Sequence, residues 1–66
     1  MNFAERLKEL RLKYDLTQLD LAIETGYSQS IISAWEKNKF QPNALALIIL
    51  SRFFGESVDY LLGLID

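Results

Sequence analysis

The sequence contains no cysteine and no histidine among its 66 residues. Without cysteine there is no disulfide and no thiolate ligand for a metal. The additional absence of histidine excludes most zinc and iron sites and most nucleophile–base pairs. The carboxylates are scattered along the chain without a paired site, so the sequence argues against an enzyme. It predicts no metal and no cofactor.

Long hydrophobic segments are also missing. The longest apolar run, residues 44–50, is far too short to cross a bilayer. The first ten residues hold no continuous apolar stretch of the kind found in signal peptides. Half of all residues are nevertheless hydrophobic, well above a disordered composition. We therefore expect a single small, soluble, cytoplasmic domain over residues 1–66, away from membranes.

An excess of positive charge is lacking as well. The formal net charge is −2 and the pI is near 4.9, which is the wrong sign for attraction to nucleic acid. The negative surplus lies in residues 41–66, because residues 1–40 carry six basic and six acidic side chains. Net charge governs solubility and the long-range field, whereas binding depends on one face. A locally basic, DNA-binding face therefore remains compatible with this composition.

Glycine and proline are few, and the pattern between them is helical. Apolar residues recur at helical spacing in the first helix, with charged side chains on the opposite face. Polar N-caps and glycine or asparagine stops divide the chain, and no alternating strand pattern occurs. The predicted class is all-α, a compact fold of five helices. The expected ranges are 3 to about 14, 18–24, 29 to about 38, 44–54 and 58–62, with N-caps at Asn2, Thr17, Ser28, Asn43 and Ser57 and stops at Gly26, Asn38, Gly55 and Gly63.

The second and third helices meet across Thr25-Gly26-Tyr27, a turn with the length and the glycine of a helix-turn-helix. This unit covers about residues 17–38. Six blocks in order carry the resemblance to a known family: FAERLKELR, LTQLDLA, G-x-S, IISAWE, NKFQP and FFGESVDYLLG. They resemble the Xre-type, lambda-repressor-like helix-turn-helix proteins of phages and bacteria. The resemblance implies that family's five-helix DNA-binding domain, with Gln18, Ala22, Gly26 and Ile32 at the positions that define the motif.

By this resemblance, the second helix of the unit enters the major groove with its N-terminal end first. Gln29 is the expected base reader, because its amide can both donate to and accept from adenine. Ser30 can serve either kind of base edge, Ala34 offers a methyl contact, and Gln18 fits a phosphate clamp. The predicted DNA-binding set is Gln18, Ser28, Gln29, Ser30, Ser33, Ala34, Lys37, Asn38 and Lys39.

Two features of the motif have structural interpretations. The resemblance implies that Arg11 pairs with Glu36, and that Ile32 and Trp35 point inward. A helix start rich in serine and glutamine is, in the plainer interpretation, only a cap and a solvated face. In the same interpretation, Lys37 and Lys39 are ordinary surface lysines.

Several apolar residues stand where this family commonly has charged or polar ones. Leu19 and Ile23 lie four apart on one expected helix, as do Leu45 and Ile49 on another, so each pair shares a face. Either a shifted helix rotation buries these pairs, or they form an exposed partner surface. Phe40 and Ile31 add to that surface, although Ile31 could instead meet a thymine methyl.

Specific recognition by so small a module usually requires a two-fold dimer on a pseudo-palindromic site. The first choice for the dimer contact is the apolar tail Tyr60, Leu61, Leu64 and Ile65, and the second is the helix carrying Leu45 and Ile49. In the alternative, Leu61 and Leu62 fill the core and the remainder of the tail frays.

Two functional hypotheses follow. The first is a sequence-specific DNA-binding transcriptional regulator, a homodimeric repressor that blocks polymerase by occupying double-stranded DNA. The second is a protein-interaction module, an antitoxin or antirepressor, whose apolar faces bind another protein while DNA binding is secondary or lost. The acidic balance and the single glutamine reader favour the second modestly. Feeble binding to random DNA at physiological salt is expected, because it depends on phosphate neutralisation.

Overall fold

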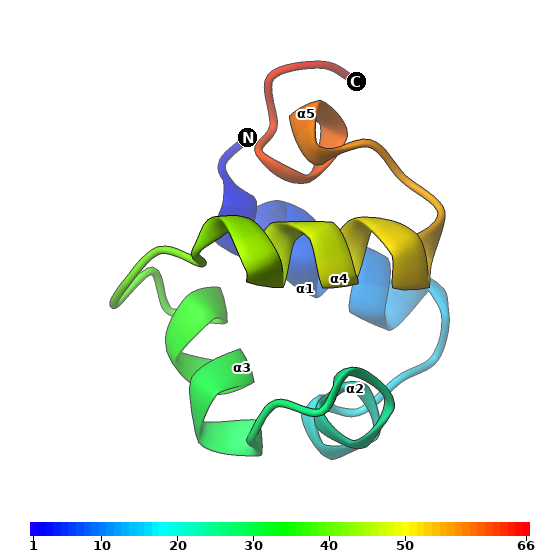
Figure 1. The fold of residues 1–66 in the computed structure, drawn as a ribbon, viewed down its shortest axis with the longest axis vertical. Coiled ribbons are helices and arrows are strands. Elements are labelled where there is room, and N and C mark those ends of the chain that lie inside the picture. The colour runs from blue at the N-terminus through cyan, green and yellow to red at the C-terminus, as the bar shows by residue number, and fades with distance from the viewer.

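The structure, a computed structural model, describes all residues 1–66 and consists of five α-helices without a strand. The helices are α1 (Phe3–Lys13), α2 (Gln18–Thr25), α3 (Gln29–Glu36), α4 (Ala44–Phe54) and α5 (Val58–Leu61) (Figure 1). The predicted all-α class with five helices is confirmed. None of the helices has the length and apolar content needed to cross a membrane.

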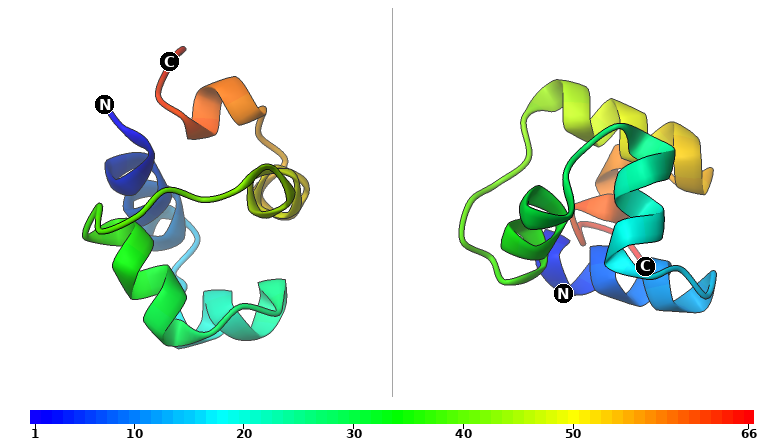
Figure 2. Two further views of the ribbon diagram at one scale, coloured as in Figure 1. Left: turned by 60° about the vertical axis from the view of Figure 1, so that its left-hand side comes forward. Right: turned by 90° about the horizontal axis from the view of Figure 1, so that it is seen from below.

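The helices are arranged so that the helix-turn-helix unit lies at one end of the molecule. Figures 1 and 2 show α2 and α3 at this end, and α5 with both chain termini at the opposite end. The longer helices α1 and α4 lie across the middle of the molecule, between these two ends. The outer surface of α2 and α3 is therefore left uncovered by the C-terminal tail.

Every helix begins at a polar side chain whose oxygen accepts the backbone N–H three residues later, at N···O distances of 2.8–3.1 Å. Such an N-cap satisfies one of the amide groups that a helix start leaves without a partner. At Thr17, the Asp20 carboxylate also accepts the Thr17 backbone N–H, and this contact lowers the pKa of Asp20. The five predicted caps are confirmed: Asn2, Thr17, Ser28, Asn43 and Ser57.

The helix ends follow the predicted stops with small differences. Asn38 adopts the left-handed conformation (φ 58°), as expected, but α3 already ends at Glu36. The predicted end near Asn38 included the turn that follows, in which the Lys39 N–H donates to the Ala34 carbonyl at 2.9 Å. Asp15 is also left-handed (φ 59°), which the sequence pattern does not indicate.

One hydrophobic core draws side chains from all five helices. Its largest fully buried side chains are those of Leu7, Leu10, Leu21, Ile32, Leu50 and Leu61. The position of Leu61 corrects a prediction, because a side chain buried at the centre of the core cannot take part in a dimer contact. The core alternative is right for Leu61, and Leu62 packs against the same cluster.

The apolar residues predicted to form pairs on α2 and α4 differ in their solvent exposure. Leu19 is 52% exposed, Ile23 70% and Leu45 61%, so a shifted rotation that buries them is wrong for these three. Ile49 is half-buried, and its neighbour Ile48 is exposed instead. The exposed α4 surface therefore differs by one residue from the predicted pair.

The remaining apolar candidates divide in the same way. Phe40 is exposed, whereas Ile31 is half-buried and packs against the core. In the tail, Leu64 and Ile65 are exposed and Tyr60 is half-buried. Only the last part of the predicted dimer surface is thus available to a partner.

Arg6 is a buried cation, although the charged side chains of this helix were expected on the face opposite its apolar residues. Its Nε lies 2.9 Å from the Met1 sulfur, and its Nη2 donates to the Ile65 carbonyl at 3.3 Å. The guanidinium carbon lies 3.7 Å from the centre of the Tyr60 ring, a cation–π contact. Arg6 therefore joins the N-terminal residue to the C-terminal tail.

Gly63 lies at the closest approach of the two chain ends. It has a positive φ of 77°, and a Cβ there would overlap with the Met1 carbonyl oxygen. We expect Gly63→Ala to lower the free energy of unfolding by about 1–3 kcal/mol, because it adds backbone strain and separates the two ends. Urea unfolding followed by circular dichroism measures this loss.

Gly55→Ala is the matched control for this prediction. Gly55 has a similar φ of 69°, but nothing lies within 4 Å of an added Cβ. It therefore isolates the strain of the left-handed conformation from the steric clash. Equal losses of stability in the two variants would contradict the close approach of Gly63 to Met1.

Candidate nucleic-acid interface

The inner face of the helix-turn-helix unit is fixed by three buried side chains. Ala22 is buried where α2 meets α3, and its small size lets the two helices approach. Ile32 and Trp35 point into the core, as predicted. The Trp35 ring makes edge contacts with Tyr27 and Phe3, at centroid distances of 5.0 and 6.1 Å. This packing sets the rotation of α3 and turns its other face outward.

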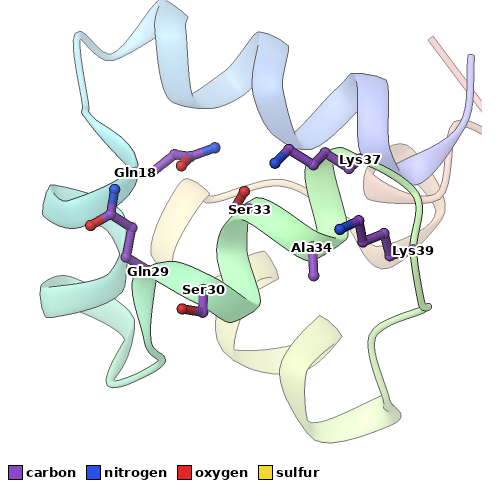
Figure 3. A pocket seen from close by; sticks show the side chains of 7 residues that line it. All are labelled: Gln18, Gln29, Ser30, Ser33, Ala34, Lys37 and Lys39. Carbon is purple, nitrogen blue, oxygen red and sulfur yellow. The ribbon is translucent and has the colours of Figure 1, made fainter.

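The outward face of α3 and the start of α2 form an open hollow of about 350 Å³ (Figure 3). No acidic side chain lines it, and its only apolar lining residue is Ala34. The structure therefore brings together seven of the nine residues predicted to bind DNA. They are Gln18, Gln29, Ser30, Ser33, Ala34, Lys37 and Lys39.

The two other predicted residues lie outside the hollow and have local partners. The Ser28 hydroxyl oxygen accepts the Ile31 N–H at 3.1 Å as the N-cap of α3. The Asn38 side-chain oxygen accepts the Gln41 amide at 3.0 Å in the loop after α3. Both residues are exposed beside the hollow, so they remain predicted DNA contacts.

The hollow is chemically different at its two ends. Figure 3 shows the amides of Gln18 and Gln29 at one end and the Lys39 side chain at the other. Gln29 and Ser30 begin α3 and are exposed, whereas Ser33 and Ala34 are half-buried one turn later. Neutral donors and acceptors thus gather at the N-terminal end of α3, and positive charge lies beyond its C-terminal end.

Glu36 is the acidic residue closest in sequence to the lysines, and Arg11 neutralises it. The Arg11 Nε and Nη2 donate to the two carboxylate oxygens of Glu36 at 2.7 and 3.0 Å, and the Nη1 donates to the Leu16 carbonyl at 2.8 Å. The Arg11 and Glu36 side chains are only 10% and 5% exposed. The hydrogen bond to Glu36 raises the pKa of Arg11; burial opposes this effect and the charge of Glu36 adds to it. The pair expected from the resemblance is therefore present.

The amide of Gln18 joins this pair, a contact that was not predicted from the sequence. Its Nε2 donates to Glu36 Oε1 at 3.2 Å, across 18 positions of sequence. Spacing within a helix carries no signal for a contact between the start of α2 and the end of α3. Gln18 is thus both a lining residue of the hollow and part of a buried ionic network.

Comparison with known proteins agrees with this geometry. The helix-turn-helix family model matches residues 7–61. The transcriptional activator BcrR of Enterococcus faecalis is 42% identical over 63 residues, which are 96% of this chain and 31% of BcrR. The crystal structure of the P22 c2 repressor with a synthetic operator superimposes with a TM-score of 0.88 and 35% identity, covering 94% of each chain.

The same arrangement of helices also occurs as part of an enzyme. Hydroxypropylphosphonic acid epoxidase from S. wedmorenis matches with a TM-score of 0.80 and 26% identity over 91% of this chain, but over only 32% of the enzyme. A shared fold therefore does not decide the function. The family match covers most of the chain, and this chain spans less than a third of BcrR. The chain belongs to the Xre-type, lambda-repressor-like helix-turn-helix family.

Proposed function

We propose that this chain is the DNA-binding domain of a cytoplasmic transcriptional regulator. It places α3 in the major groove of an operator and acts as a homodimeric repressor on a pseudo-palindromic site. The observation that carries the proposal is the hollow, in which seven predicted contact residues meet without a carboxylate. The structural similarity of the whole chain to the P22 c2 repressor, which was crystallised with a synthetic operator, supports this proposal.

The electrostatics of the hollow support binding by an acidic protein. The Arg11–Glu36 pair removes the acidic residue nearest the lysines as a source of repulsion, because both charges are buried against each other. Lys37 and Lys39 are exposed and free of ion pairs, so they can meet phosphates. Phosphate contacts position a protein on DNA and base contacts select the sequence. The net charge of −2 therefore does not exclude a specific interface.

Base selection falls to the exposed start of α3. Gln29 can donate to and accept from an adenine edge, an interaction worth about 1–3 kcal/mol of discrimination. Ser30 adds a hydroxyl that suits several base edges. Ala34 offers only a methyl group, which favours contact with thymine. This set is small, so a second copy of the domain is needed for tight and specific binding.

Two surfaces with exposed apolar side chains support self-association. Leu64 and Ile65 are exposed in the tail, at the end of the molecule opposite the helix-turn-helix unit. Leu45 and Ile48 are exposed on α4. The tail remains our first choice for the dimer contact and α4 the second.

Selection of binding sites from randomised duplexes tests the proposal. We expect wild-type protein to enrich an inverted repeat, and Gln29→Ala to weaken binding to that repeat by roughly 5- to 150-fold. Lys8→Ala is the control, because Lys8 is an exposed basic residue of α1 outside the hollow. Unchanged affinity in Gln29→Ala, or tight binding to random duplexes at physiological salt, would contradict the proposal.

The second candidate is a protein-interaction module, an antitoxin or antirepressor. The observation that favours it is the exposure of Leu19 and Ile23 on the outer face of α2, since adjoining exposed apolar side chains commonly mark a partner surface. Folded wild-type protein that enriches no duplex at low or moderate salt would favour this candidate. A retained dimer or complex lost in Ile23→Ser would then identify the surface.

A further inference from the structure

The two ends of the chain meet at one buried side chain, that of Arg6. We infer that these ends form one surface on which a second copy of this chain binds, and that Arg6 is the positioning residue that assembles it. Met1, Leu64 and Ile65 make up this chain-end surface. The inference rests on the proposed function, because it assigns the residues of the dimer contact that the proposed regulator requires.

Arg6 contacts the N-terminal residue and the tail with two nitrogen atoms of its guanidinium. Its Nε lies 2.9 Å from the Met1 sulfur, and its Nη2 donates to the Ile65 carbonyl oxygen at 3.3 Å. The guanidinium carbon lies 3.7 Å from the centre of the Tyr60 ring. Because a guanidinium is planar and its donors are fixed in direction, these three contacts have to fit one geometry. Arg6 thereby sets the position of Ile65 relative to Met1 and to α5.

The end of the tail is held by little else. Backbone hydrogen bonds fix the tail as far as Leu64, whose N–H donates to the Asp59 carbonyl at 2.9 Å. Ile65 takes part in no backbone–backbone hydrogen bond, and the contact from Arg6 is its one hydrogen bond to a side chain. Without Arg6, the Ile65 side chain is therefore free to move away from Met1, and the chain-end surface falls apart.

Arg6 is a costly residue for its buried position. It is 4% exposed, its Nη1 has no hydrogen-bond partner, and the only carboxylate within 4 Å is that of Glu9, at 3.8 Å from the Nε. Arg11, in contrast, meets both carboxylate oxygens of Glu36. Replacing a poorly paired buried charge by an apolar side chain of similar volume is often neutral or stabilising. Core stability therefore does not explain Arg6, whereas control of the tail does.

The chain-end surface suits a second copy of the chain. Its three members are large apolar side chains exposed to solvent, and none of them lines the hollow. Figures 1 and 2 show both termini at the end of the molecule opposite α2 and α3, so self-association leaves the hollow uncovered. In a two-fold dimer the same patch of both copies meets, and an apolar patch is complementary to itself. Because the start of α3 offers few base readers, specific recognition requires such a copy.

Sedimentation equilibrium of the free protein tests the inference. We expect wild type to dimerise, and Arg6→Leu and Leu64→Ser each to raise the dimer dissociation constant by about tenfold or more. The double variant should be little worse than the weaker single variant, because both changes remove the same surface. Leu45→Ser is the matched control: Leu45 is similarly exposed but lies on α4, so its replacement should leave the dimer dissociation constant unchanged.

Two further measurements separate positioning from folding. In urea, at a concentration where wild type is monomeric, Arg6→Leu should unfold at a midpoint equal to or above that of wild type. Arg6→Lys keeps the charge but lacks the fork of donors, so it should weaken the dimer as Arg6→Leu does. By nuclear magnetic resonance of the monomer, the Ile65 amide should have an order parameter of about 0.85 in wild type and below about 0.6 in both variants.

A mobile Ile65 in wild type, or a rigid one in Arg6→Leu, would overturn the inference. So would a wild type that stays monomeric at its highest soluble concentration, or a dimer that survives both Arg6→Leu and Leu64→Ser. The surviving dimer would leave the proposed function intact, with α4 as the contact. A dimer lost in both variants, from a protein that enriches no duplex, would support the inference and refute the proposed function instead.

Discussion

Replacing Glu36 by alanine is expected to lower the free energy of unfolding by about 3–5 kcal/mol. The substitution leaves Arg11 buried with a single neutral partner, the Leu16 carbonyl at 2.8 Å, and an unpaired buried charge is costly. It also removes the acceptor of the Gln18 amide. Urea unfolding at 25 °C, followed by circular dichroism, measures the loss. A domain of this size has a total stability of only about 3–10 kcal/mol, so a large unfolded fraction in water is expected.

Two further variants separate the charge from the packing. Replacing both partners, as Arg11→Met with Glu36→Leu, should recover most of the stability, because apolar groups of similar volume need no pairing. Glu24→Ala is the surface control, since Glu24 is exposed and has no ion-pair partner; its effect should stay within about 0.5 kcal/mol. A loss below about 1 kcal/mol in Glu36→Ala would show that the pair is solvated rather than buried.

Trp35→Ala should cost a similar amount, about 3–5 kcal/mol. The indole is 3% exposed and joins α3 to α1 through Phe3 and to the helix-turn-helix turn through Tyr27. Its removal leaves a cavity beside the helix that carries the proposed DNA contacts. Because Trp35 is the only tryptophan, unfolding of this variant must be followed by circular dichroism rather than by tryptophan fluorescence.

Trp35→Phe and Leu45→Ala are the comparisons for this prediction. The Trp35 N–H is buried without a hydrogen-bond partner, so phenylalanine loses volume but no hydrogen bond and should cost less than alanine. Leu45 is 61% exposed, and its replacement by alanine should change stability by no more than about 0.5 kcal/mol. Equal effects of Trp35→Ala and Leu45→Ala would contradict the packing of α3 described above.

Much of the fold could be predicted because its signals are local. The five N-caps act over three residues, and Gly26 and Gly55 end their helices by adopting a left-handed conformation. The buried positions Ala22, Ile32 and Trp35 followed from the resemblance, whose motif already contains the packing of two helices. The end of α3 was predicted near Asn38 but lies at Glu36. The difference arises because the turn after Glu36 also forms backbone hydrogen bonds, and its sequence continues the helical pattern.

The sequence by itself determined where the helices begin and which residues line the proposed interface, since both depend on neighbours a few positions apart or on a shared motif. Only the tertiary structure decided that Leu61 is core, that Ile48 rather than Ile49 is exposed, and that Arg6 is buried. It also decided that Gln18 reaches Glu36. These outcomes depend on how far each helix rotates about its axis and on which distant segments meet. Helical periodicity does not contain that information, because it relates residues only within one helix.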